Sequence, residues 1–210
     1  MSHRRAVLPR PAFVLPWSEM TPPAYSVLTI CGLDELGDHS ARGVSHVLSI
    51  LDPEWPEPEA FWAFDPHMRT TLHFHDAIVA APGIVLPQRQ DVEAILSFGR
   101  DVGEDLRHLL IHCHAGISRS TAAMAMILAQ AFPHESEDAI VDRLVGIRPQ
   151  AWPNSLMIGF ADDLLGREGR LKAAAGKVYA RRLAAKPELA EVMRKLDRAR
   201  EVELAQAADD

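Results

Sequence analysis

A cysteine and an arginine stand six positions apart in the segment HCHAGISRS, which covers residues 112–120. A cysteine thiolate is a strong nucleophile, and an arginine guanidinium can bind two oxygens of a phosphate at once. Between them, Gly116 lets the backbone turn tightly or approach a ligand closely. The segment therefore predicts a loop in which Cys113 attacks a phosphorus atom while Arg119 holds the phosphate oxygens.

The residues on either side of this loop predict a buried strand before it and a buried helix after it. Residues 108–113 are mostly apolar before their end, which is typical of a strand covered on both faces. Residues 119–132 have high helix propensity and are apolar almost all round. At such a junction, backbone N–H groups and the positive end of the helix dipole stabilise an anion. They also favour the thiolate form of Cys113 over the neutral thiol.

The rest of the chain alternates strands with helices. Short apolar runs rich in β-branched residues predict strands at 24–32, 43–51, 69–76 and 108–113. Helical periodicity and capping residues predict helices in 88–106, 119–132, 136–148 and 153–166. Residues 52–68 contain four prolines and four large aromatic residues, which predicts a loop. The alternation predicts an α/β fold: a central, largely parallel, twisted sheet of about four to five strands flanked by helices.

The two ends of the chain differ from this pattern. Residues 1–24 are rich in proline and have no period, which indicates an irregular arm before a domain at 25–166. Residues 167–210 indicate a helical extension in two pieces, broken at Pro187. The second piece carries the clearer apolar stripe, at Leu189, Val192, Met193 and Leu196. The stripe needs a cover, either the body of the protein or, as the sharper hypothesis, a second copy in a homodimer.

Composition restricts the kind of protein. The chain has 210 residues, 48% of them apolar and 24% charged, which is typical of one globular domain with an extension. Its net charge of −7 argues against nucleic acid as the main partner. The basic residues of 167–200 could form a solvated helical face or could contact an acidic partner or a membrane surface. No apolar run is long enough to span a membrane, and no signal peptide is expected. With Cys31 and Cys113 as the only cysteines, a disulfide framework is not expected and a cytoplasmic location is predicted.

The segment HCHAGISRS resembles the signature of the protein tyrosine phosphatase superfamily, in particular its dual-specificity branch in a bacterial type. The resemblance extends over about residues 25–166. It implies hydrolysis of a phosphorylated protein or a small phosphomonoester through a phosphocysteine intermediate, without a cofactor or metal. It also implies that Ser120 stabilises the thiolate and that His112 supports the loop. The phosphate would be bound by Arg119 and the residues before it, which are His114, Ala115, Gly116, Ile117 and Ser118.

The leaving oxygen also needs a proton from a general acid. In this superfamily the acid is an aspartate on a movable loop after a strand, some way before the cysteine. Asp76 stands 37 residues before Cys113, at the end of the predicted strand 69–76. Asp65, before that strand, and Asp91, in the first turns of a predicted helix, are rivals. The resemblance implies that Asp76 protonates the leaving group and then activates water.

Some alternatives remain open at this point. Four histidines near the strand ends are candidate zinc ligands: His73, His75, His112 and His114. Arg119 argues against zinc, since its guanidinium would repel a cation beside the cysteine. Cys31 could be a core residue or could protect an oxidised Cys113 through a disulfide. A protein of another class, a scaffold that binds a phosphorylated partner without appreciable turnover, could also use the same loop.

Two further segments are candidates for shaping the site. The run RPQAWPN contains Arg148, Gln150 and Asn154, which by resemblance could orient the hydrolytic water or line the rim. It could instead join two helices, with Asn154 as the helix cap. The aromatic residues of 52–68 could pack on one another or form an apolar wall beside the substrate: Trp55, Phe61, Trp62 and Phe64. The cysteine loop contains no lysine, which argues against a phosphoinositide and for phosphotyrosine or a broad range of phosphomonoesters.

Overall fold

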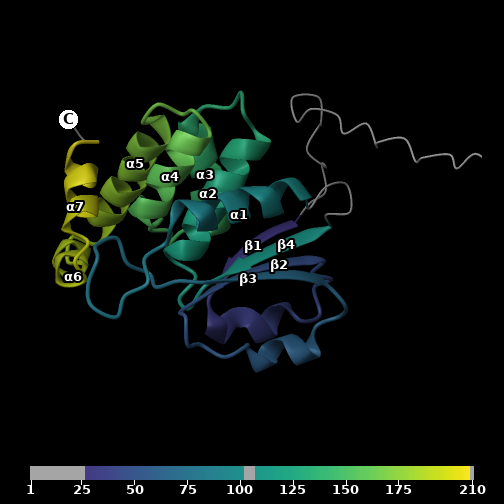
Figure 1. Cartoon of the computed structure of the whole chain (residues 1–210). Coiled ribbons are helices and arrows are strands. Elements are labelled where there is room, and N and C mark those ends of the chain that lie inside the picture. The colour runs from purple at the N-terminus through teal and green to yellow at the C-terminus, as the bar shows by residue number, and fades with distance from the viewer. Residues whose placement is uncertain (1–26, 102–106, 209–210) are drawn as a thin grey trace, which may run out of the picture.

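The computed structural model describes residues 27–101 and 107–208. Four parallel strands form one sheet in the order β1–β4–β2–β3, with helices on both faces (Figure 1). Along the chain they are β1 (Val27–Cys31), β2 (His46–Leu51), β3 (Met68–His73) and β4 (His108–His112). The predicted parallel sheet is confirmed, and no strand end differs from its predicted position by more than three residues. The arm predicted at 1–24 lies outside the described residues.

The strand β4 lies inside the sheet and leads into the cysteine loop. All of its residues are buried, because side chains alternate between two covered faces. Leu110 faces the smaller of two hydrophobic cores, whereas Leu109 and Ile111 belong to the larger one. The register aligns His112 with Cys31 of β1 and with Ser49 of β2. The carboxyl ends of three strands therefore meet where the cysteine loop begins.

Five helices and the larger core lie on one face of the sheet, above it in Figure 1. The helix α2 is buried along almost its full length, as its apolar sequence predicted, because other helices surround it. A well-defined cap begins α3, where Ser136 accepts a hydrogen bond from the Ala139 nitrogen. The five helices are α1 (Arg89–Asp101), α2 (Arg119–Ala131), α3 (Glu137–Ile147), α4 (Ser155–Leu164) and α5 (Arg170–Ala185).

Two 3-10 helices, η2 (Leu33–His39) and η3 (Glu59–Ala63), cover the opposite face of the sheet. The segment predicted as a loop at 52–68 therefore contains a helical turn. Phe61 anchors this turn in the smaller core and packs edge-on against Phe64, with ring centroids 5.0 Å apart. For these two rings, the predicted packing of the aromatic segment on itself is confirmed.

The C-terminal segment forms three helices instead of the predicted two. After α5, the break at Pro187 is confirmed and is followed by α6 (Leu189–Lys195) and α7 (Ala199–Gln206). A second break separates α6 from α7, where Asp197 has a φ of 57°. Aspartate tolerates this left-handed conformation better than most residues, but the sequence pattern did not indicate it. No helix in the described ranges is long and apolar enough to cross a membrane.

The two apolar stripes are covered to different extents. The weaker stripe belongs to α5, whose Tyr179 is fully buried in the larger core. The clearer stripe belongs to α6: Leu189 and Met193 pack against the larger core and are partly buried, whereas Val192 and Leu196 are 44% and 59% exposed. A homodimer contact through these residues stays a prediction. The predicted boundary at residue 166 falls between α4 and α5, where the hydrophobic core is continuous.

Candidate active site

The cysteine loop, residues 113–118, connects β4 to α2 and passes very close to the end of β1. Gly116 has a φ of 66°, and a Cβ placed on it would lie 2.6 Å from the Gly32 nitrogen. A Cβ on Gly32 would in turn lie 2.8 Å from the His114 oxygen. Glycine at 116 therefore supplies both the left-handed backbone and the room for two chain segments to touch.

The carbonyl groups of residues 114–118 all accept hydrogen bonds from the protein around the loop. These bonds run from Leu33 N to His114 O (2.8 Å), from Arg148 Nη2 to Ala115 O (3.2 Å), from Arg148 Nε to Gly116 O (3.0 Å), from Trp152 N to Ile117 O (2.9 Å) and from Ala122 N to Ser118 O (2.9 Å). In a trans peptide the N–H points away from the carbonyl oxygen. The N–H groups of 115–119 therefore point away from these donors, and none donates to another residue in the described part of the chain.

The nucleophile predicted from the sequence lies at the start of this loop. Cys113 is only 2% exposed, and its Sγ lies 3.2 Å from Oγ of Ser120 in the first turn of α2. A hydroxyl at this distance can donate to a thiolate. The side chain of Ser120 is therefore within hydrogen-bond distance of the sulfur.

Arg119 is held at one end and left without a partner at the other. Its side chain is 3% exposed, and Nη1 donates to Asp52 Oδ1 and to the Phe74 oxygen, both at 2.6 Å. Its Nε is buried and has no hydrogen-bond partner among the described residues. Because a buried donor without an acceptor is costly, this nitrogen is suited to the oxygen of an anion.

Asp76 lies beside the cysteine loop, on the segment that follows β3. Its Oδ1 accepts hydrogen bonds from Ser118 Oγ (2.7 Å) and Asn154 Nδ2 (2.9 Å), and Nη1 of Arg198 lies 3.3 Å away. All three donors contact the same oxygen. Within the described ranges Oδ2 accepts no hydrogen bond, so it is the oxygen that can exchange a proton with a ligand.

The two rival aspartates do not contact the cysteine loop. Asp65 lines a cavity with Ser45 and Arg107, at the amino ends of the strands and thus at the opposite edge of the sheet. Asp91 accepts a hydrogen bond from the Gln88 nitrogen at 2.7 Å, where α1 begins. Of the three candidates, Asp76 is the one that contacts the cysteine loop, through Ser118.

The histidines next to the cysteine have structural partners. Nε2 of the buried His112 lies 2.6 Å from Ser49 Oγ, and burial lowers the pKa of His112 to about 4. Nε2 of His114 accepts a hydrogen bond from the Asp52 nitrogen at 3.2 Å. Burial, and then the charge of Arg119, lower the pKa of His114 as well. Both rings are therefore neutral near pH 7 and do not compete with Arg119 for an anion.

The other candidate metal ligands, His73 and His75, also have backbone partners. Nδ1 of His73 lies 3.3 Å from the Asp52 oxygen, and Nδ1 of His75 accepts a hydrogen bond from the Val85 nitrogen at 3.0 Å. Among the described residues, no group of three or more His, Cys, Asp or Glu side chains is arranged to bind a metal ion. Cys31 is buried in the smaller core, and its burial raises the pKa of the thiol to about 12.

Arg148 lies behind the cysteine loop, whereas the resemblance placed it near the rim. Besides its bonds to two loop carbonyls, it donates through both terminal nitrogens to Glu35, at 2.8 and 2.7 Å. Glu35 also accepts from the Gly32 nitrogen at 2.6 Å, so the pair clamps β1 to the loop. The hydrogen bond with Arg148 lowers the pKa of Glu35. Sequence reasoning missed Glu35, which no local pattern distinguishes.

Asn154 caps a helix and also contacts the candidate acid. Its side-chain oxygen accepts hydrogen bonds from the nitrogens of Leu156 (3.1 Å) and Met157 (3.2 Å), so the predicted cap of α4 is confirmed. Its side-chain nitrogen donates to Asp76, as described above. The start of α4 thus positions the candidate acid.

Of the aromatic residues proposed as a wall, Trp55 reaches the cysteine loop. Its ring centroid lies 4.4 Å from that of His114, and the side chain is 45% exposed. Phe61 and Phe64 lie in and against the smaller core, and Trp62 is 81% exposed. The apolar wall is therefore reduced to one indole at the rim of the loop.

Three further side chains at the site were missed from the sequence. Asp52 follows β2 directly, and its position at the carboxyl end of a parallel strand is a signal that could have identified it. Arg198 and Glu201 come from the C-terminal segment and are 5% and 0% exposed. Arg198 contacts Asp76 and donates to Ser118 Oγ at 2.9 Å. No spacing or composition pattern connects these two residues with the cysteine loop.

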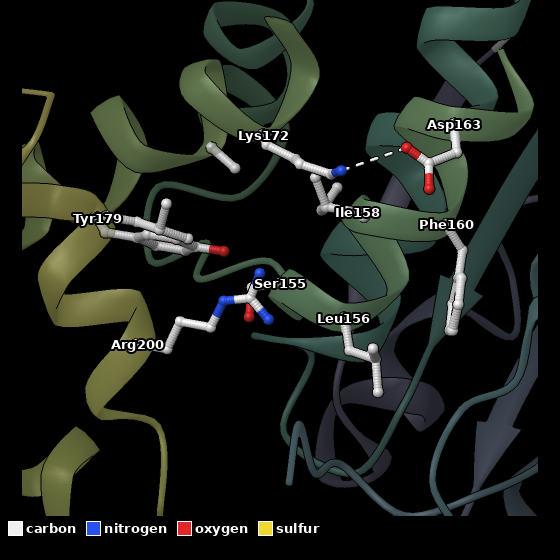
Figure 2. A pocket seen from close by; sticks show the side chains of 11 residues that line it. Ser155, Leu156, Ile158, Phe160, Asp163, Lys172, Tyr179 and Arg200 are labelled. Carbon is white, nitrogen blue, oxygen red and sulfur yellow. Dashed lines mark hydrogen bonds and ion pairs between the residues drawn. The ribbon is translucent and has the colours of Figure 1, made fainter. Parts of the chain in front are cut away.

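A separate cavity lies between α4, α5 and α7 (Figure 2). Tyr179 and Arg200 face Leu156 and Ile158 across it. An ion pair between Lys172 and Asp163 (3.2 Å) lies at its edge. The cavity is lined by residues of these three helices and by no residue of the cysteine loop. It is therefore distinct from the candidate active site.

Comparisons with known proteins support the fold. No family model matches the sequence, and no curated protein matches it. Several solved structures do match. Human DUSP28 is 15% identical, with a TM-score of 0.50, over 67% of this chain and 94% of that chain. Cydia pomonella PTP-2 phosphatase is 17% identical, with a TM-score of 0.51, over 65% of this chain and 84% of that chain.

A mouse protein described as a dual specificity phosphatase, crystallised with zinc tungstate, is also similar. It is 17% identical, with a TM-score of 0.51, and the match covers 74% of this chain and 95% of that chain. About a quarter to a third of the present chain thus has no counterpart in these structures. At these identities the likeness concerns the fold. The chain has the α/β fold of the tyrosine and dual-specificity phosphatases, with additional C-terminal helices.

Proposed function

We propose that this chain is a cysteine-dependent phosphatase of the tyrosine or dual-specificity type, with residues 25–166 as its phosphatase domain. The main support is the set of donors around Cys113, which we name the phosphate cup: the backbone N–H groups of 115–119 and Nε of Arg119. These donors have no acceptor among the described residues. Such a set fits an anion with several oxygens, and a neutral ligand would leave it unsatisfied.

In the first step, the Cys113 thiolate attacks phosphorus opposite the ester oxygen. The S–P bond forms as the P–O bond breaks, and the phosphate cup holds the charge on the transferred group. Asp76, in its protonated form, gives its proton to the leaving oxygen. The products are an alcohol or phenol and a phosphocysteine.

In the second step, water attacks the phosphocysteine while the Asp76 carboxylate accepts a proton from it. The S–P bond breaks, inorganic phosphate leaves and Cys113 returns to the thiolate. Ser120 Oγ, 3.2 Å from the sulfur, can donate a hydrogen bond to the departing thiolate. Both steps proceed without a metal.

The rim favours an aryl phosphate as substrate. The exposed indole of Trp55 lies against His114, the first residue after the cysteine, and can pack on an aromatic leaving group. The loop contains no lysine that would bind a second phosphate. We therefore expect phosphotyrosine or related phosphomonoesters to be hydrolysed better than polyphosphorylated lipids.

The experiment that tests this proposal is hydrolysis of para-nitrophenyl phosphate, in reductant and chelator, by the wild type and by Cys113→Ser. The wild type should turn over and Cys113→Ser should not, although the variant should still bind vanadate, an oxyanion similar to phosphate. Cys31→Ser is the matched control, because its buried thiol belongs to the smaller core, and it should remain active.

Equal activity in Cys113→Ser and wild type would refute the nucleophile. Vanadate binding without any turnover in the wild type would instead support a scaffold that retains phosphorylated partners. Activity lost in chelator and restored by zinc would refute the metal-independent mechanism.

A further inference from the structure

We propose that Arg198, in the segment between α6 and α7, is a positioning residue of the active site that fixes Asp76 against the cysteine loop. The inference rests on the proposed function, because it takes Asp76 as the general acid. It gives the C-terminal helices a part in the reaction. In Figure 1 the segment after β3, in teal, runs next to these helices, in yellow.

The contacts of Arg198 form a closed ring with the acid and the loop. Its Nη1 lies 3.3 Å from Asp76 Oδ1, and its Nη2 donates to Ser118 Oγ at 2.9 Å. Ser118 Oγ in turn donates to Asp76 Oδ1 at 2.7 Å. Because a guanidinium is planar and rigid, it fixes the distance between the acid and the last residue of the cysteine loop.

The charge of Arg198 is compensated inside the protein. Glu201, with no exposed surface, accepts hydrogen bonds from Arg198 Nε (2.7 Å) and Nη2 (2.8 Å). It also accepts from Trp152 Nε1 (2.5 Å) and from the nitrogen of Ser155, the first residue of α4 (2.9 Å). Burial of an ion pair is favourable only when further hydrogen bonds satisfy both partners, as they do here. Arg198 is thus held in one orientation before any substrate binds.

The contacts on Asp76 are one-sided in a way that suits an acid. Arg198, Ser118 and Asn154 all contact Oδ1, so the carboxyl group is fixed while Oδ2 carries no hydrogen bond to any described residue. A fixed carboxyl group transfers its proton efficiently only if the reacting oxygen is placed correctly, and small displacements are costly. Loss of Arg198 should therefore impair proton transfer more than phosphate binding.

The test compares substrates that need the proton with substrates that do not. The variants are Arg198→Lys and the double variant Arg198→Met with Glu201→Gln, which leaves no unpaired buried charge. The control is Arg200→Met, an exposed arginine two residues further along that lines the cavity of Figure 2. For each we would measure kcat/KM with phenyl phosphate, a poor leaving group, and with para-nitrophenyl phosphate, a good one, together with the thermal unfolding midpoint.

In the double variant, kcat/KM with phenyl phosphate should fall about tenfold or more, because part of the rate enhancement by the general acid is lost. The fall with para-nitrophenyl phosphate should be much smaller. Arg198→Lys should lie between the double variant and the wild type, and the control should match the wild type. If kcat/KM falls equally for both substrates and the thermal unfolding midpoint is also lowered, Arg198 only stabilises the fold. That result would overturn the inference.

Asp76→Asn distinguishes failure of the general-acid assignment from failure of the role given to Arg198. If this variant shows no preference for the good leaving group, the general-acid assignment fails and the inference fails with it. If Asp76→Asn shows the preference and the Arg198 variants do not, the proposed function stands and this inference alone is overturned.

Discussion

The cysteine loop and the network around Asp76 share Ser118, but they are assembled in different ways. The loop is one continuous segment between β4 and α2, and its donors are mostly backbone groups. The network combines side chains from segments far apart in the chain: Asp76, Ser118, Asn154, Arg198 and Glu201. The nucleophile and phosphate cup are therefore a local structure, whereas the acid is positioned by tertiary packing.

This difference implies that the two parts should fail differently when they are altered. A change in the phosphate cup should affect every substrate alike, because all phosphomonoesters present the same phosphate. A change in the network should affect substrates according to their leaving group.

The largest effect is expected for Asp76→Asn. With phenyl phosphate, kcat/KM should fall about 10²–10⁴-fold, the usual contribution of a general acid, and the fall should be smaller with para-nitrophenyl phosphate. Steady-state kinetics on both substrates measure it. Asp91→Asn, which alters an aspartate at the start of α1, is the control and should behave as wild type. Equal losses on the two substrates would show that another group is the acid.

Arg119→Lys should reduce kcat/KM roughly 10²–10³-fold, as loss of a transition-state donor does in other enzymes. A lysine provides no planar guanidinium, in which Nε is free for the ligand while Nη1 donates to Asp52 and to the Phe74 oxygen. Here the loss should be the same for both leaving groups. Arg181→Lys, at a half-exposed surface ion pair, serves as control. A loss that depends on the leaving group would contradict a pure phosphate-binding role.

His112 should make the fold sensitive to mild acid. Burial lowers its pKa to about 4 from 6.5, so the unfolded chain binds the proton more readily than the folded one. Its contribution is therefore complete above pH 6.5 and is lost as the pH falls towards 4, by roughly 3 kcal/mol at pH 4. Denaturant unfolding of wild type and His112→Gln between pH 7 and 4 measures it. If both proteins lose stability equally, His112 is not the cause.

The smallest effect is expected for Glu35→Gln, at the clamp behind the cysteine loop. Arg148 would keep its bonds to the loop carbonyls but lose a charged partner, and Glu35 is partly exposed. We expect kcat/KM to fall about 3–10-fold, equally for both leaving groups. Glu59→Gln, in η3, provides a control on a glutamate away from the loop. A loss restricted to phenyl phosphate would place Glu35 with the acid and not with the cup.

The elements around Cys113 could be predicted because their signals are local. An apolar run, a glycine-containing turn and an all-round apolar helix follow one another, and each is explained by burial or backbone geometry. The same holds for Asn154, because an asparagine directly before a predicted helix indicates a helix cap. Asp76 could be proposed because the resemblance implies an aspartate after a strand upstream of the cysteine. Its contacts with Ser118, Asn154 and Arg198 could not be predicted.

The C-terminal segment shows where such signals end. The clearer apolar stripe lies in the second piece, yet α5 is buried and α6 is only partly covered, because α7 packs on α5 after a break at Asp197. Arg198 and Glu201 look like ordinary members of a charged segment. Their roles depend on where α7 packs, which is decided by contacts with residues far away in sequence.

The hydrogen bonds to the loop carbonyls have a thermodynamic consequence for inhibition. Since every carbonyl of residues 114–118 is held by a donor of the surrounding fold, the ordering entropy of the loop is lost during folding and not during binding. A small rigid oxyanion should then bind without rearranging the backbone. Larger inhibitors should gain affinity mainly from what they contact at the rim, where Trp55 offers an exposed aromatic face.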